Sequence, residues 1–194
     1  MGTFNIGSIT ADVGWEFVSS QTGPGGDGVA SIDFSDVFVA GYDYQFSGDN
    51  ITLHEEAPPG GVFANPMRCY LETYIAETYA WQTSNYSESG IIHRDDVVTG
   101  TGSRTRGYGN IAFEMNFGSA TGETTSLTIT VINPGAATVT WCQSHVLGES
   151  SLTTGINAHG GFGRPAEVNT GLQFKSSGPY IVTGNFLMYK RKRS

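Results

Sequence analysis

Apolar and polar residues alternate with a period of two along most of this sequence. In residues 111–117 the apolar side chains occupy every second position, and small or polar side chains stand between them. Residues 126–131 repeat the pattern with threonine and serine in the polar positions. Such alternation directs one face of a strand into a core and the other toward solvent, as in antiparallel sheets. The pattern therefore predicts an all-β protein.

Composition supports this prediction and indicates where strands end. The chain has 27 glycines among 194 residues and only 10 lysines and arginines. Glycine disfavours helix interiors, whereas the threonine, valine, tyrosine and phenylalanine that fill much of the chain favour strands. Glycine-rich segments at residues 23–28, 58–61, 100–109 and 160–163 are predicted to be loops between strands. The length fits one domain.

Turn signals and alternation together give the expected strands and their connection. The sequence Asn133-Pro134-Gly135 separates two threonine-rich segments, so these segments are predicted to form a hairpin. Eight to ten strands without a convincing helix predict one antiparallel β-sandwich. Residues 1–14 are predicted to be an N-terminal arm that packs on a neighbour. The expected strands are residues 15–19, 30–38, 44–53, 68–81, 111–117, 126–131, 138–142 and onward, 168–174 and 180–189.

Charge is distributed unevenly between the body of the chain and its C-terminal end. The formal net charge is −8, yet four basic residues occur in one run, Lys190, Arg191, Lys192 and Arg193. An acidic body repels nucleic acid, so the sequence predicts no nucleic-acid partner. The basic run has three interpretations: a solvated terminus, a contact with nucleic acid or membrane, or a contact with an acidic neighbouring protein. Neither a signal peptide nor a membrane-spanning segment is predicted.

Motifs for catalysis or metal binding are weak. The sequence lacks a GxSxG elbow, a P-loop and an HExxH motif, and its histidines occur singly. His54-Glu55-Glu56 and His93-Arg94-Asp95-Asp96 are the nearest approaches to a metal site, but each is predicted to be a solvated loop. We therefore expect no cofactor, no metal and no enzymatic activity, with a cupin-like metal enzyme as the weaker alternative. Cys69 and Cys142 are predicted to be buried free thiols, although a disulfide stays open.

Two sets of residues are candidates for contact with a partner or a glycan. Trp81 is followed by Asn85 and Tyr86 in a polar segment, and an aromatic residue beside amides can hold a sugar. Trp15 and Trp141 are predicted to be core or interface aromatics. A second candidate is the glycine-rich segment 100–109, which is either a partner contact or a mobile hairpin tip. Its relevant side chains are Arg104, Arg106 and Tyr108.

The order of these strands and turns is similar to that of a known family. The beginning of the match is Trp15-Glu16-Phe17-Val18-Ser19-Ser20-Gln21-Thr22, Ala30-Ser31-Ile32-Asp33-Phe34 and Tyr42-Asp43-Tyr44-Gln45-Phe46. Its end is Leu172-Gln173-Phe174, Ser176-Ser177-Gly178, Ile181, Gly184, Phe186 and Met188-Tyr189-Lys190. These residues resemble jelly-roll structural proteins of tailed-bacteriophage virions. The chain departs from the family at Lys190, where a glycine is usual, at Pro179-Tyr180, which replace one asparagine, and in its basic end.

The resemblance implies a fold and a role. It implies an antiparallel jelly-roll sandwich over residues 15–190, followed by a basic tail at residues 191–194. The implied role is structural and non-enzymatic: a capsid decoration, minor head protein or tail-associated protein that assembles in the host cytoplasm. Its partners would be other virion proteins and further copies of the chain, with a trimer expected first. The arm and the basic run are the expected attachment elements, and a glycan-binding tail-fibre tip is the alternative.

Overall fold

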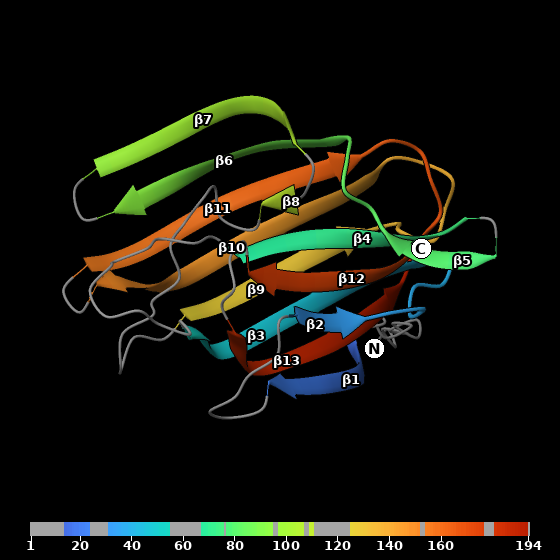
Figure 1. The fold of residues 1–194 in the computed structure, drawn as a ribbon, viewed down its shortest axis with the longest axis horizontal. Coiled ribbons are helices and arrows are strands. Elements are labelled where there is room, and N and C mark those ends of the chain that lie inside the picture. The colour runs from blue at the N-terminus through green and yellow to red at the C-terminus, as the bar shows by residue number, and fades with distance from the viewer. Residues whose placement is uncertain are drawn as a thin grey trace, which may run out of the picture.

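The fold consists of two antiparallel β-sheets that face each other (Figure 1). The structure is a computed structural model, and it describes residues 14–23, 31–54, 67–75, 77–94, 97–106, 109–110, 125–151, 154–176 and 181–193. Within these ranges all regular structure is β, which confirms the prediction of an all-β antiparallel sandwich. The predicted strand 111–117, most of the predicted arm and the glycine-rich segment 58–61 lie outside the described residues.

Among the described residues, the larger sheet contains eight strands and the smaller sheet contains five. The order in the larger sheet is β1 (Glu16–Gly23), β13 (Ile181–Lys192), β3 (Tyr42–His54), β9 (Thr125–Ile132), β10 (Thr140–Ser151), β11 (Thr154–Arg164), β6 (Tyr86–Arg94) and β7 (Val97–Arg106). The order in the smaller sheet is β2 (Ser31–Phe34), β12 (Asn169–Ser176), β4 (Met67–Ile75) and β5 (Thr78–Trp81), with β8 (Gly109–Asn110) paired to β4. The first described strand thus pairs with the last, and the second pairs with the last but one.

The core lies between the sheets and is rich in aromatic rings. Phe34 from the smaller sheet meets Phe46 from the larger sheet edge to face, with ring centroids 5.1 Å apart. Phe174 and Phe186 extend this cluster, with ring centroids 5.0 Å apart. Edge-to-face packing of phenyl rings contributes beyond simple burial. The inward positions of β9 confirm the expected alternation, because Leu127, Ile129 and Val131 are buried and the residues between them are more exposed.

Cys69 on β4 and Cys142 on β10 are both buried in this core and both are free thiols. This state agrees with the sequence prediction. Burial raises the pKa of both thiols, because the thiolate would lose its hydration. The cysteines are therefore neutral, small apolar residues of the core.

Local turn chemistry accounts for both a confirmed and a corrected strand prediction. The hairpin around Asn133 is confirmed, because β9 and β10 pair directly and Asn133 has a left-handed backbone with φ of 53°. The single long strand predicted at residues 68–81 is wrong. It is divided into β4 and β5, which pair with each other on either side of Glu77, whose φ is 63°. Likewise, residues 35–38 leave the strand predicted at 30–38 and form a loop that begins near Asp36, at φ of 52°.

Two predicted glycine-rich loops are in fact strands. Residues 160–163 lie inside β11, which pairs with β10 on one side and β6 on the other. Residues 100–106 lie in β7, at the end of the sheet. The reason is visible at Gly163, where a Cβ atom would come within 2.8 Å of two ring carbons of Trp141. Glycine in β11 therefore makes room for a neighbouring side chain and does not form a turn.

Candidate binding surfaces

The basic C-terminal run belongs to the sandwich. Lys190, Arg191 and Lys192 are residues of β13 and pair with Tyr44, Asp43 and Tyr42 of β3. The chain stays attached after the strand ends, because the Arg193 amide donates a hydrogen bond to the Gly41 carbonyl at 2.9 Å. The predicted boundary between a sandwich ending at residue 190 and a separate tail is therefore corrected. The basic side chains of β13 find partners at the start of β3, because Asp43 attracts Arg191 and the Tyr42 ring lies under the Lys190 ammonium group.

Most of the positive charge in this run has a partner within the fold. Arg191 Nη2 lies 3.6 Å from Asp43 Oδ2, and Arg193 Nε lies 3.7 Å from Asp43 Oδ1. The Arg191 guanidinium also covers the Trp15 ring at 4.8 Å. Lys190 Nζ lies 3.8 Å from Glu16 Oε2. Lys192 is exposed and is the member of the run best placed to meet another molecule.

The predicted sugar site at Trp81, Asn85 and Tyr86 does not form a shared surface. Tyr86 is fully buried, and its hydroxyl accepts a hydrogen bond from the Leu71 amide at 2.8 Å and donates one to the Gln82 carbonyl at 3.1 Å. Burial raises the pKa of this phenol. Trp81 is half-buried at the end of β5, and Asn85 is exposed with φ of 63°. Tyr86 is therefore a core residue, and the prediction that it contacts a glycan is wrong.

The second predicted contact set lies mostly on a strand. Arg104 and Arg106 occupy backbone positions in β7, where they pair with Glu88 and Tyr86 of β6. Tyr108 lies outside the described residues. The two arginines thus belong to a strand that ends the sheet order, and the expectation that they occupy a loop tip is corrected. Their role in partner contact stays a prediction.

A buried carboxylate braces the loop between β2 and β3. Glu72 on β4 is 2 % exposed, and it accepts hydrogen bonds from Ser35 Oγ at 2.5 Å, the Asp36 amide at 2.9 Å and Thr170 Oγ1 at 3.0 Å. These donors come from the loop and from β12. Buried charge is tolerated when its lone pairs are hydrogen-bonded in this way. Glu72 therefore joins the loop to the smaller sheet.

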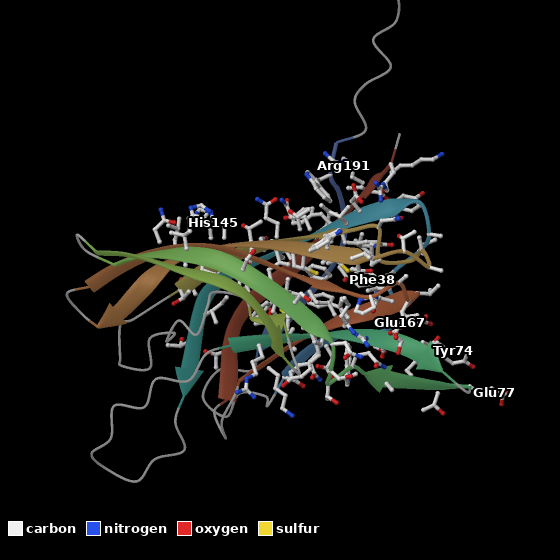
Figure 2. All side chains as sticks on the ribbon, turned by 90° about the horizontal axis from the view of Figure 1, so that it is seen from above. Phe38, Tyr74, Glu77, His145, Glu167 and Arg191 are labelled. Carbon is white, nitrogen blue, oxygen red and sulfur yellow. The ribbon has the colours of Figure 1, made fainter. Side chains whose placement is uncertain are left out.

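The outer face of the larger sheet was not identified from the sequence. On β10 the side chains of Cys142, Ser144 and Val146 are buried. The alternate residues lie on the other face of the sheet, away from the smaller sheet; Figure 2 shows His145 projecting from this face. These outward residues are Trp141, Gln143, His145 and Leu147, and all except His145 are exposed.

Trp141 is the dominant side chain of this outer face. It is 55 % exposed, and its ring carbons lie against Gly163 of β11. Gly163 and Gly161 in turn pair with Ser87 and Ser89 of β6, which are both exposed. An indole thus stands beside a floor of glycine and serine.

Two histidines that are well separated in the sequence meet next to this floor. His145 of β10 and His159 of β11 are register partners, and their rings stack with centroids 4.2 Å apart and planes 5° apart. His145 Nε2 is hydrogen-bonded to Asn157 Oδ1 at 3.0 Å. This pair could not be predicted from the sequence, because the antiparallel pairing of β10 and β11 brings the two histidines together. No group of three or more histidine, cysteine, aspartate or glutamate residues suited to a metal occurs in the described part of the chain.

A small hollow continues the outer face beyond His145. Its volume is about 90 Å³. It lies across β3, β9 and β10, and five of its seven lining residues are polar or charged, although apolar atoms provide the larger part of its surface. The lining residues are Ser47, Asp49, Ser126, Leu127, Thr128, His145 and Leu147.

Comparison with known proteins gives no family for this chain. No protein-family model matches the sequence, and no curated protein matches it significantly. Among the described residues, no helix is long and apolar enough to cross a membrane.

Proposed function

We propose that this chain is a non-enzymatic structural protein of a tailed-bacteriophage virion, exposed on the particle as a capsid decoration, minor head or tail-associated protein. The observation that carries the proposal is the nested pairing of the chain ends, β1 with β13 and β2 with β12. A long hairpin rolled on itself to form a jelly roll pairs its strands in this nested way. The pairing supports the jelly-roll fold implied by the resemblance over residues 15–190.

The buried polar residues of the sandwich support a structural role. Glu72 braces the β2–β3 loop, as described above. Arg164 is 2 % exposed and lies 3.1 Å from Glu167, while Asn169 donates to Thr140 Oγ1 at 2.8 Å. These groups connect strands and loops to one another. Such connections stiffen a protein that persists outside a cell.

The direct test is the location of the chain in phage lysates. Antibodies raised against the purified chain would be used on density-gradient fractions of the phage that encodes it, and on intact particles by immunogold labelling. We expect the chain to band with infectious particles and the label to lie on their surface. A chain found only in the soluble fraction, at the top of the gradient, would overturn the proposal.

Assembly of the isolated chain can be measured separately. We propose a homotrimer, so light scattering should give three times the 20.7 kDa of one chain. A monomeric mass at high protein concentration would remove the trimer from the proposal and leave the virion location to the first experiment.

Attachment through the basic run is best tested by a charge reversal. Deletion of residues 190–194 is unsuitable because residues 190–192 pair with β3. Lys192→Glu alters an exposed side chain, and Lys175→Glu, at an exposed position on β12, is the matched control. We expect Lys192→Glu to reduce the number of copies on particles and Lys175→Glu to leave it unchanged. Equal occupancy for both variants would rule out attachment through the basic run.

A further inference from the structure

We propose that the outer face of the larger sheet binds a neutral oligosaccharide, with the Trp141 indole as the stacking platform and Gln143, His145 and Asp49 as hydrogen-bonding groups. This site is distinct from the one that the sequence predicted around Trp81, which lies on β5 of the smaller sheet. The inference does not depend on a virion location, because it rests on the surface of the isolated chain.

Trp141 has the environment of a sugar platform. Its ring carbons rest on Gly163, whose missing side chain lets the indole approach the backbone of β11. The indole nevertheless remains 55 % exposed. The supported ring therefore offers an open aromatic face of large area to a ligand. The C–H face of a pyranose packs against such a ring and removes apolar area on both partners from water.

Hydrogen-bonding groups follow the platform along the same strand. Gln143 is exposed, and its amide both donates and accepts. His145 is two residues further, about 13 Å from Trp141 at roughly 3.3 Å per strand residue. Beyond it, Asp49 and Ser47 are among the residues that line the hollow of about 90 Å³. A ligand that reaches from the indole to the hollow must therefore be a short oligosaccharide and not a single ring.

The histidine in the middle of this path is held in one orientation. His145 stacks on His159 and is hydrogen-bonded to Asn157. A side chain that is already fixed loses little conformational freedom when a ligand binds. Beside Trp141 and Gln143, the glycines of β11 and the serines of β6 leave the path unobstructed, and the His159 ring borders the path at His145.

Charge identifies the class of oligosaccharide. Trp141, Gln143 and the floor serines Ser87 and Ser89 are uncharged, and Asp49 is the acidic residue of the hollow. The chain as a whole carries a net charge of −8. The negative charge of Asp49 and the negative net charge of the chain both repel sialylated, uronic-acid or sulfated glycans. A second protein copy is a poorer occupant, because Gln143, His145 and His159 stand between the exposed apolar side chains of this face, which are Trp141, Ile91 and Leu147, whereas interface cores are contiguous and apolar.

The experiment uses the full chain on an array of neutral and acidic glycans, followed by calorimetry with a soluble form of the best neutral ligand. We expect neutral glycans to bind and acidic glycans not to bind. Trp141→Ala should weaken the affinity about tenfold or more, which corresponds to about 1.4 kcal/mol. Gln143→Ala should weaken it severalfold, while Trp141→Phe should retain part of it because a ring remains. Trp81→Ala is the matched control and should bind as the unmodified chain does.

Several results would overturn the proposal. It fails if no neutral glycan binds, if only acidic glycans bind, or if binding survives Trp141→Ala. It also fails if Trp141→Ala changes the oligomeric mass and no glycan binds, because a second copy then covers this face. Urea midpoints for each variant establish that lost binding does not reflect unfolding. Trp141→Phe and Gln143→Ala keep the test decisive if Trp141→Ala proves unstable.

Discussion

Replacement of the buried Glu72 by alanine should strongly destabilise the sandwich. The carboxylate has three donors, Ser35 Oγ, the Asp36 amide and Thr170 Oγ1. A hydrogen bond to a charged group contributes about 1.5–3 kcal/mol, and an orphaned buried donor costs about 1–3 kcal/mol. The Ser35 and Thr170 hydroxyls can rotate toward other acceptors, whereas the Asp36 amide cannot. We therefore expect Glu72→Ala to lower the free energy of unfolding by about 3–5 kcal/mol.

Urea unfolding followed by tryptophan fluorescence and circular dichroism measures this loss. Glu72→Gln retains one carbonyl oxygen, so it should lose less, about 1–2 kcal/mol. Glu16→Ala is the control, because Glu16 is 64 % exposed and its lysine contact lies in solvent, so its loss should stay below about 0.5 kcal/mol. If Glu72→Ala cost less than about 1 kcal/mol, the carboxylate would not brace the loop as we argue.

Two further predictions concern alkaline pH and the floor of the outer face. Burial raises the pKa of the Cys69 and Cys142 thiols above 9.0 and of the Tyr86 phenol above 10.0, so the folded state holds these protons more tightly than the unfolded state. The stability that this difference in proton binding provides is complete below pH 9 and is lost as the pH rises toward the raised pKa values of the folded state. Urea midpoints that do not fall between pH 8 and 10.5 would contradict this prediction. Gly163→Ala places a Cβ 2.8 Å from the Trp141 ring, so the exposed ring must turn, which should cost about 0.5–1.5 kcal/mol and alter the near-ultraviolet tryptophan signal. An unchanged signal and a cost below about 0.5 kcal/mol would show that the indole does not rest on Gly163.

The parts of the fold that depend on neighbouring residues could be predicted from the sequence. The β9–β10 hairpin follows from the alternation on each strand and from the Asn133-Pro134-Gly135 turn between them. The turn at Glu77 was missed because its left-handed backbone occurs at a residue type that rarely adopts it. The absence of a metal motif favoured buried free thiols, but the sequence left a disulfide open, and the structure shows that both thiols are free.

The parts that depend on distant residues could not be predicted. The glycines at 160–163 resemble a loop in the sequence, and only the neighbouring Trp141 explains why a strand needs them. Tyr86 follows a polar segment that suggested exposure, but the Leu71 amide and the Gln82 carbonyl satisfy its hydroxyl inside the protein. The basic run was expected to be a tail because its partner, Asp43, lies on a strand from the other end of the chain.

The candidate site on the outer face of the larger sheet also depends on residues that are distant in the sequence. Trp141 was expected to be a core or interface aromatic, and its burial could not be decided without the register of β10 against β11. His145 and His159 each looked solitary in the sequence, yet the register makes them partners. Candidate sites on sheet faces therefore follow from strand pairing, which a single sequence does not reveal.

The nested pairing of the chain ends has a consequence for biosynthesis. Glu16 pairs with Lys190, and Ser31 pairs with Lys175, so β1 and β2 find their partners only when almost the whole chain has been made. Contacts between residues so far apart in the sequence slow folding, because a large loop must close first. Until β13 has been synthesised, β1 presents an unpaired strand edge to other nascent chains. A chain that stops before β13 lacks the strand that pairs with both β1 and β3, so it cannot complete the larger sheet.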